Sequence, residues 1–208
     1  MLGIAAMFAV KILVDRNIGM AATPQFKFQN VPSPIRDDAA AGATLTLISG
    51  SLDSDSAALT ALTDGAVPTD EDQPAQNVFF HSASWGGRVR VDFGTRIEIA
   101  QINSYSWHPD SRAPQLYKVF AGDESDPNFN PAPSSKLDPA TCGWKLIAFV
   151  DAHSPDPDDE GGQYGVSIRD DAGGIVGAFR YLLFDFFEAE GDDPWGNTFY
   201  SEIDVIRR

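Results

Sequence analysis

The segment VRVDFG, at residues 89–94, alternates apolar and polar side chains before it ends on a glycine. This period of two is what a half-buried antiparallel strand requires, because successive side chains along a strand point to opposite faces of the sheet. Other apolar or alternating runs of strand length lie at residues 44–48, 78–80, 97–105, 116–121, 144–150, 165–168, 179–187 and 199–206. The sequence therefore predicts about eight or nine short strands.

Turn-forming residues separate these runs. The chain holds 14 prolines and 18 glycines, which is typical of proteins built from strands and loops. The pattern predicts no helix of ordinary length, and it contains no repeat of about 20 to 50 residues that would indicate a propeller or a solenoid. We expect an all-β fold, an antiparallel β-sandwich of the jelly-roll kind. Its long loops, where binding sites are usually built, are predicted at residues 122–143, 151–163 and 188–198.

The chain of 208 residues is strongly acidic. It carries 30 Asp and Glu residues against 15 Lys and Arg, a formal net charge of -15. Clustered Lys and Arg residues are what hold nucleic acid, so this charge argues against a nucleic-acid partner. An acidic surface is also repelled by anionic membranes, whereas it suits cations such as calcium, which prefers oxygen ligands.

The N-terminus allows two interpretations. Residues 2–10 are apolar, but this run is too short to span a membrane, so we expect no membrane insertion. No basic residue precedes it, although Met20–Ala22 could serve as a rough cleavage site for an export signal. We expect residues 1–22 to be such a signal or a short helix packed on the domain, and residues 23–42 to be an extended lead-in. The predicted sandwich domain then covers residues 43–208.

Catalytic motifs are missing from the sequence. It has three histidines but no His-Glu-x-x-His zinc pair, and its single cysteine, Cys142, permits neither a Cys-x-x-Cys pair nor an intramolecular disulfide. It has no Gly-x-Ser-x-Gly elbow and no Gly-rich phosphate loop before a helix. Carboxylates are abundant enough to form a glycosidase pair, yet solvated loop carboxylates explain the same composition. We expect a protein that is not an enzyme.

Three short motifs follow one another along the chain. They are ALTDG at residues 61–65, VRVDFG at residues 89–94 and SEIDV at residues 201–205. Together they resemble the discoidin, coagulation-factor type C and galactose-binding-like carbohydrate-binding module families. In those families an Asp-Gly turn precedes a strand of the second kind, and a Glu-Ile-type strand closes the fold. The resemblance spans roughly residues 43–206 and implies the same sandwich in a binding module.

The resemblance also implies one structural calcium ion, where the Asp-Gly turn meets the last strand. Calcium takes six to eight oxygen ligands in flexible geometry, and a tight turn supplies several carbonyls at once. The alternative is that Asp64 only caps its turn while Glu202 is an exposed strand residue. The implied ligands are the Asp64 and Glu202 carboxylates, the Thr69 oxygens and the backbone carbonyls around Leu62 and Val67.

Sugar-binding groups are expected in loops at one end of the sandwich. A sugar needs a flat aromatic ring against its apolar face and hydrogen bonds to its neighbouring hydroxyls. The competing interpretation is structural, with Trp107 in the core and Arg112 paired with a carboxylate. The candidate loops are the segments at residues 105–112 and 193–197, and the segment at residues 80–85 is a third loop with similar groups. The candidate ligand-binding residues are Trp107, His108, Arg112, Trp195 and Asn197.

Three functions are compatible with these observations. We expect a non-catalytic, extracellular or cell-surface module that binds carbohydrate, with a cell-surface glycan as its partner. This expectation depends on the resemblance and on polar-aromatic loops. The first alternative is a structural or adhesive surface protein that binds another protein. The second is a glycoside-processing enzyme with a carboxylate pair in a loop cleft.

Overall fold

The computed structural model describes residues 9–19, 22–82, 84–156, 161–190 and 197–208, and in these parts the chain is built from strands and short 3-10 helices. All the strand pairings are antiparallel, which confirms the predicted all-β fold. The strands are β1 (Val10–Ile18), β2 (Thr44–Ser49), β3 (Gly87–His108), β4 (Leu116–Gly122), β5 (Lys145–Asp151), β6 (Gly162–Asp170), β7 (Gly177–Phe186) and β8 (Tyr200–Arg207). The 3-10 helices are η2 (Leu59–Thr63), η3 (Pro74–Gln76) and η4 (Pro139–Cys142).

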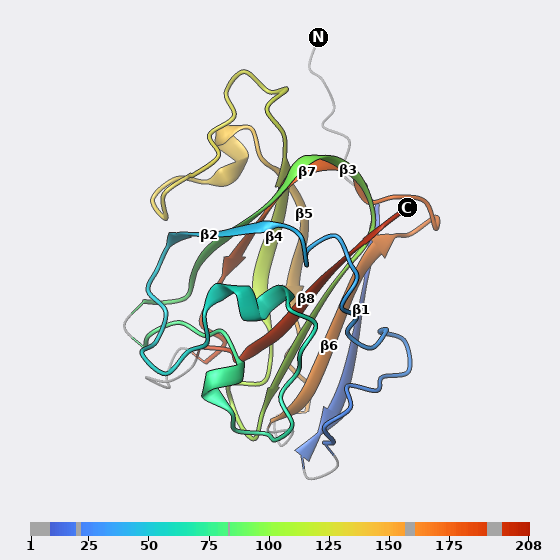
Figure 1. The fold of residues 1–208 in the computed structure, drawn as a ribbon, viewed down its shortest axis with the longest axis vertical. Helices are drawn as coiled ribbons and strands as arrows, with labels where there is room; N and C mark the ends of the chain where they lie inside the picture. Colours follow the sequence, from blue (N-terminus) through green and yellow to red (C-terminus); the bar gives the residue numbers. More distant parts are fainter. Residues whose placement is uncertain (1–8, 20–21, 83, 157–160, 191–196) are drawn as a thin grey trace.

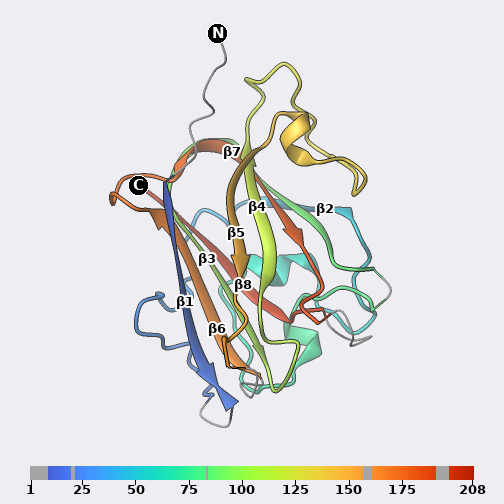
Figure 2. The same cartoon turned by 180° about the vertical axis from the view of Figure 1, so that it is seen from behind.

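Strand β3, 22 residues long, belongs to both layers of the sandwich. Its first part, residues 87–92, lies between β2 and β7, and its last part, residues 101–108, lies between β6 and β8. One layer therefore runs β5-β4-β7-β3-β2 and the other β1-β6-β3-β8. Figure 1 looks onto β8, and Figure 2, from behind, onto β4 and β5.

The bend in β3 falls where the VRVDFG segment ends. The register with β7 shifts between Asp92 and Ile97. Gly94 adopts a φ of 73°, and its N–H donates to Asp92 Oδ1 at 2.8 Å. A left-handed residue suits glycine because it has no Cβ. The aspartate and the glycine thus form the local turn that carries the strand from one layer to the other.

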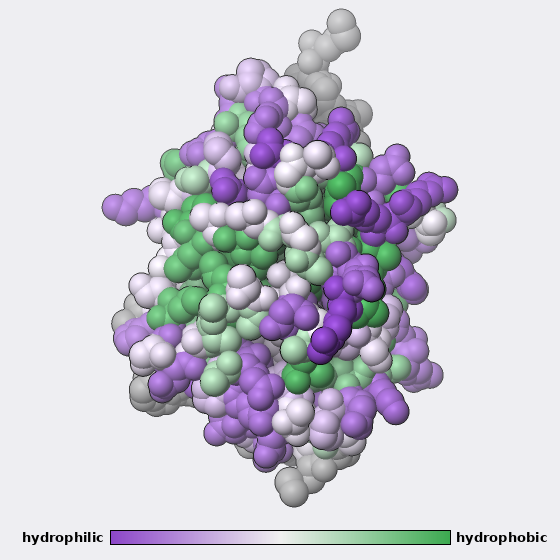
Figure 3. Space-filling view, in the orientation of Figure 1, coloured by the Kyte–Doolittle hydropathy of each residue, from purple (hydrophilic) through white to green (hydrophobic). Residues whose placement is uncertain are grey.

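The core lies between the two layers. The alternation of VRVDFG is realised, since Val89 and Val91 are fully buried. Burial of each such side chain stabilises the fold by about 1.5–3 kcal/mol. On the face that Figure 3 shows, hydrophilic residues lie mainly around the periphery, and an apolar area lies over β2 and η2. Among the other fully buried core residues are Ile102, Val119, Val166, Leu182, Phe184 and Ile203.

Strand β1 differs from the expectation for the N-terminus. Val10–Ile18 is neither a helix nor separate from the domain, but an edge strand paired with β6 along its whole length. β-Branched residues such as Val10, Ile12 and Val14 favour a pleated, half-buried surface, which suits an edge strand. The sheet therefore begins before residue 43. Residues 1–8 lie outside the described parts.

The segment between β1 and β2 has no strand but contributes to the core. Phe26 and Val31 are buried against Tyr105 and Trp107, on the outer face of the second layer. The Tyr105 hydroxyl donates to the Pro32 carbonyl at 2.8 Å. The predicted lead-in therefore covers one face of the sandwich.

Replacing Ile102 with alanine tests the central position of β3. Ile102 is fully buried between the layers, so the truncation should reduce the free energy of unfolding by about 2–5 kcal/mol. Chemical denaturation provides the measurement. The control is Arg96→Ala near the bend, where an exposed side chain should change stability by no more than about 0.5 kcal/mol. Equal effects of the two substitutions would contradict the assigned core.

Candidate functional site

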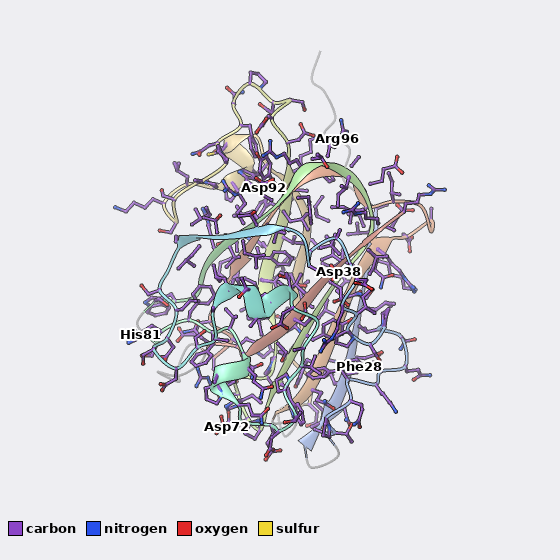
Figure 4. All side chains as sticks on the ribbon, in the orientation of Figure 1. Phe28, Asp38, Asp72, His81, Asp92 and Arg96 are labelled. Carbon is purple, nitrogen blue, oxygen red and sulfur yellow. The ribbon has the colours of Figure 1, made fainter. Side chains whose placement is uncertain are left out.

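A pocket of about 360 Å³ opens at the end of the sandwich opposite the bend in β3. In Figure 4, Asp72 and His81 lie toward the lower end of the molecule, and Asp92 and Arg96 lie near the upper end. The volume falls within the range of small-molecule sites. The lining residues come from loops after β2, before η3 and after β3, and from the segment before β8. They are Asp53, Asp55, Asp72, Pro74, Phe79, His108, Pro109, Asp110, Arg112 and Phe199.

Aromatic rings form the floor of this pocket and fix Arg112. Phe79 and Phe199 stack with their ring centroids 4.2 Å apart. The Arg112 guanidinium lies 4.1 Å from the Phe199 centroid and 4.7 Å from that of Phe79. Its Nε donates to the Asn197 carbonyl at 3.1 Å. Cation-π contact and the hydrogen bond together hold a planar group of donors in one orientation at the pocket wall.

His108 supplies an acceptor beside this guanidinium. Its ring meets Phe199 edge-on with centroids 4.6 Å apart, and its Nδ1 lies 2.6 Å from Asp110 Oδ1. Burial lowers the pKa of His108, and Asp110 acts in the opposite direction. The imidazole is therefore neutral at pH 7, and the 2.6 Å approach of the Asp110 carboxylate favours the tautomer whose Nδ1–H donates to it over the 3.3 Å contact in which the Asp110 N–H would donate to Nδ1. Nε2, which has no hydrogen-bond partner among the described residues, can then accept a hydrogen bond.

Carboxylates surround the opening of the pocket. Asp53, Asp55, Asp72 and Asp110 all line it, and the first three form no ion pair within the described parts of the chain. These groups accept hydrogen bonds from hydroxyl or amine donors and repel an anionic ligand. The arrangement is suited to a neutral, hydroxyl-rich molecule.

The structure brings together two of the five predicted ligand-binding residues, His108 and Arg112. Trp107 is 3% exposed and meets Phe26 edge-on, because adjacent residues of β3 face opposite sides of the sheet. The prediction of a ligand role for Trp107 is thus corrected to a core role. Asn197 is buried, with its side chain directed at the His81 carbonyl, and it contributes its own carbonyl to Arg112. Trp195 lies outside the described residues.

Sequence reasoning missed Phe79, Phe199 and the aspartates of the loops. The two phenylalanines occur in apolar runs that predict strands, and nothing local distinguishes a pocket floor from a core. The aspartates belong to a chain with 30 acidic residues, so no single one stands out. Their position became visible only through the loops that the fold brings to one end.

The predicted calcium ligands are brought together in part. Glu202 Oε2 accepts the Gly65 N–H at 2.8 Å, so the last strand does meet the Asp-Gly turn. Glu202 is fully buried, which contradicts the alternative of an exposed strand residue. Asp64 Oδ1 accepts the Ala66 N–H at 2.8 Å and so caps its own turn.

Of the remaining predicted ligand residues, Thr69 donates its N–H to Gln73 Oε1 at 2.8 Å. The side chain of Leu62 is in the core and that of Val67 packs against the cluster of Tyr105 and Trp107, whereas the calcium prediction concerns the backbone carbonyls of these two residues. In the part of the chain that is described, no group of three or more His, Cys, Asp or Glu side chains is arranged to hold a metal ion.

Two buried acidic residues of β8, Glu202 and Asp204, lie beside this turn. Burial, together with the charges of Asp204 and Asp64, raises the pKa of Glu202 to about 9. Burial and the charge of Asp38 raise the pKa of Asp204 to about 7. Asp38 Oδ2 is itself buried without a hydrogen-bond partner. The cluster thus needs a proton or a cation to compensate its charge.

Comparisons with known proteins identify the fold. No family model and no curated protein matches the sequence. A family 32 carbohydrate-binding module from C. perfringens NanJ, solved with galactose, is similar in structure with a TM-score of 0.50 and 10% identity over 79% of this chain and 93% of that one. This is the fold of galactose-binding-like, discoidin-type domains.

Two further structures with the galactose-binding-like fold show the same likeness. A fucose-binding module of Streptococcus pneumoniae has a TM-score of 0.51 and 13% identity over 88% of this chain and 100% of that one. The lectin-binding domain of lectinolysin, solved with Lewis b, has a TM-score of 0.51 and 13% identity over 84% and 99% of the two chains. At such identities the comparisons establish the fold, so the ligand has to be argued from the pocket.

Removing the carboxylate beside His108 tests the electrostatics of the pocket. Asp110 raises the pKa of His108 against the effect of burial, so Asp110→Asn should lower that pKa further. NMR titration of the His108 ring proton gives the measurement. The control, Asp151→Asn, changes the partner of His153 and should leave the pKa of His108 unchanged. A pKa of His108 that does not move in Asp110→Asn would show that the 2.6 Å pair does not persist in solution.

Proposed function

We propose that this chain is a non-catalytic carbohydrate-binding module that holds a sugar in the pocket of His108 and Arg112. The observation that carries the proposal is the Arg112 guanidinium, fixed over Phe199 and against the Asn197 carbonyl at the wall of the pocket. A rigid planar donor can bind two neighbouring hydroxyls at once. Because the side chain is already held in place, it loses little conformational entropy when the sugar binds.

The other groups of the pocket match the rest of a sugar. With Nδ1–H bonded to Asp110, His108 Nε2 is an acceptor, and Asp53, Asp55 and Asp72 offer further acceptors around the opening. Pro74 and Pro109 add apolar surface for the C–H groups of a pyranose ring. Hydroxyl groups both donate and accept, so one guanidinium, one neutral imidazole and several carboxylates form a complementary set.

The class of sugar follows from charge and from the structural neighbours. Carboxylates around the opening disfavour sialic and uronic acids, which are anionic. The similar structures were solved with galactose and with Lewis b, and one is a fucose-binding module. We therefore infer a neutral terminal sugar of a glycan as the ligand. Such glycans lie outside the cell, and we propose that the module acts there or at the cell surface.

No helix in the described residues is long and apolar enough to cross a membrane. The proposal of a non-catalytic role is supported by the absence of catalytic motifs from the sequence.

Replacing Arg112 with alanine should weaken sugar binding at least about tenfold, because a bidentate charged donor is lost from a partly desolvated site. Arg112→Lys should restore little of the lost affinity, because an ammonium group lacks the planar pair of donors of a guanidinium. A glycan array followed by calorimetry on the best neutral glycan gives the affinities. Arg96→Ala, which changes an exposed side chain near the opposite end of the sandwich, is the matched control. Wild-type affinity in Arg112→Ala would refute this location for the site.

We further propose that a calcium ion stabilises the junction of β8 with the Asp64–Gly65 turn. Support comes from the buried carboxylates of Glu202 and Asp204, whose ionised forms have no cationic partner among the described ion pairs. The donors are hard oxygens, which calcium prefers. Glu202 and Asp64 would hold the ion with the Thr69 oxygens and the carbonyls of Leu62 and Val67. Asp64 and Thr69 would then exchange their present turn hydrogen bonds for the metal.

Calcium should raise the melting temperature of the wild-type protein above its value in chelator, and Glu202→Gln should abolish the rise. At a calcium concentration 100 times the dissociation constant, the gain corresponds to about 2.7 kcal/mol. In chelator at pH 7, Glu202→Gln should be at least as stable as the wild type, because the amide is neutral without the proton that the buried carboxyl, with its pKa raised to about 9, has to take up. The exposed Glu98→Gln serves as the control, and a wild-type melt that does not respond to chelator would exclude the ion.

A further inference from the structure

A second pocket, of about 350 Å³, lies where β3 begins. It shares no lining residue with the pocket of Arg112. It is bounded by the end of β2, the start of β3 and the end of β7. Its most prominent lining residue is Trp85, whose side chain is 74% exposed, far more than those of Trp107 at 3% and Trp144 at 2%.

The backbone of Trp85 is unusual. Among the described residues it is the one non-glycine with a positive φ, 47°. A bulky residue in this region is a true outlier, and such conformations persist only where the surroundings impose them. An indole held in a strained conformation and left in water is a combination that packing alone does not explain, and it indicates a role in binding.

Close backbone contacts impose the conformation of Trp85. Gly86 has a φ of 89°, and a Cβ there would lie 2.1 Å from the Phe186 carbonyl oxygen. A Cβ on Gly50 would lie 2.7 Å from the Gly86 carbonyl oxygen. Ser84, on the other side, donates its N–H to the His81 carbonyl at 2.9 Å. The indole is therefore presented from a rigid frame, which lowers the entropic cost of a contact made through it.

Part of the remaining lining of this pocket is polar. Arg88 and Asp185 form a buried bidentate pair, with N–O distances of 2.8 and 3.0 Å. Arg88 Nη1 is occupied by loop carbonyls, including that of Leu137 at 2.8 Å. Each oxygen of Asp185, by contrast, accepts one hydrogen bond and retains a lone pair, and its side chain is 13% exposed. Ser84 and Ser135 add hydroxyls to the lining.

We propose that Trp85 and this pocket form a second saccharide-binding site. The apolar face of a neutral pyranose stacks on the indole, and its hydroxyls bond to Asp185, Ser84 and Ser135. This proposal takes only the class of ligand, a neutral saccharide, from the proposed function. The site itself is independent, because the two pockets have no residue in common. An exposed tryptophan could also insert into a lipid surface. However, the only basic residue among the described lining residues is the buried Arg88, and the chain has a net charge of -15, whereas membrane anchors combine apolar residues with basic ones.

The experiment measures binding of a panel of neutral galactose-, fucose- and glucose-terminated oligosaccharides by calorimetry and by indole fluorescence. Trp85→Gly removes the ring and suits the positive φ, so the variant is expected to fold. Trp85→Phe keeps an aromatic platform. Each change is made in the wild type and in Arg112→Ala, which isolates the second pocket. Phe149→Ala, at a half-exposed aromatic on β5, is the matched control.

We expect Arg112→Ala to retain a measurable saccharide affinity. Adding Trp85→Gly to Arg112→Ala should lower that affinity at least tenfold, whereas adding Trp85→Phe or Phe149→Ala should largely preserve it. Loss of all binding in Arg112→Ala, or unchanged affinity with Trp85→Gly, overturns the second site and leaves the proposed function intact. Trp85-dependent uptake on phosphatidylcholine vesicles without saccharide binding also overturns it, in favour of a lipid surface. If no variant and no wild-type protein binds any neutral saccharide, both proposals fail.

Discussion

The sandwich depends on one strand serving two layers. Strand β3 pairs with β2 and β7 in its first part and with β6 and β8 in its last, so neither layer exists without it. Its bend at Asp92 and Gly94 returns the strand to the end from which it started (Figure 1). Trp85 lies two residues before the start of β3, and His108 ends the strand. The two proposed sites are therefore presented by the two ends of the same rigid element, which explains how separate loops can be held in fixed positions without a disulfide.

Buried charge is handled in opposite ways in the two layers. On β3 and β7, Arg88 and Asp185 form a buried bidentate pair, and Arg88 also binds carbonyls of the loop before η4. On β8, Glu202 and Asp204 are buried without a cationic partner among the described residues. The first arrangement is self-contained. The second makes the junction of β8 with the Asp64–Gly65 turn conditional on a proton or a cation, because an isolated buried carboxylate is strongly disfavoured.

Low sequence identity to the structural neighbours, 10% and 13%, is consistent with how this fold is encoded. A sandwich core requires apolar side chains at alternate strand positions, and many sequences satisfy that requirement. Loop residues are under no such constraint, so the pocket of Arg112 and the Trp85 loop can differ entirely between proteins that share the strands. Function must accordingly be argued from the groups in each pocket.

The sequence by itself determined the class of fold and most of its strands, because the period-two pattern at residues 89–94 and its counterparts depend only on which side chains face the core. It also predicted His108 and Arg112 as ligand-binding residues, which line one pocket, and the resemblance to galactose-binding-like families predicted that Glu202 lies next to the Asp64 turn. Only the tertiary structure showed that β1 joins the sheet, that Trp107 faces inward and that Phe79 and Phe199 form a pocket floor. Edge pairing, the side of a strand on which a residue lies and the meeting of distant loops are long-range properties. They are decided by the register between strands, which no local pattern specifies.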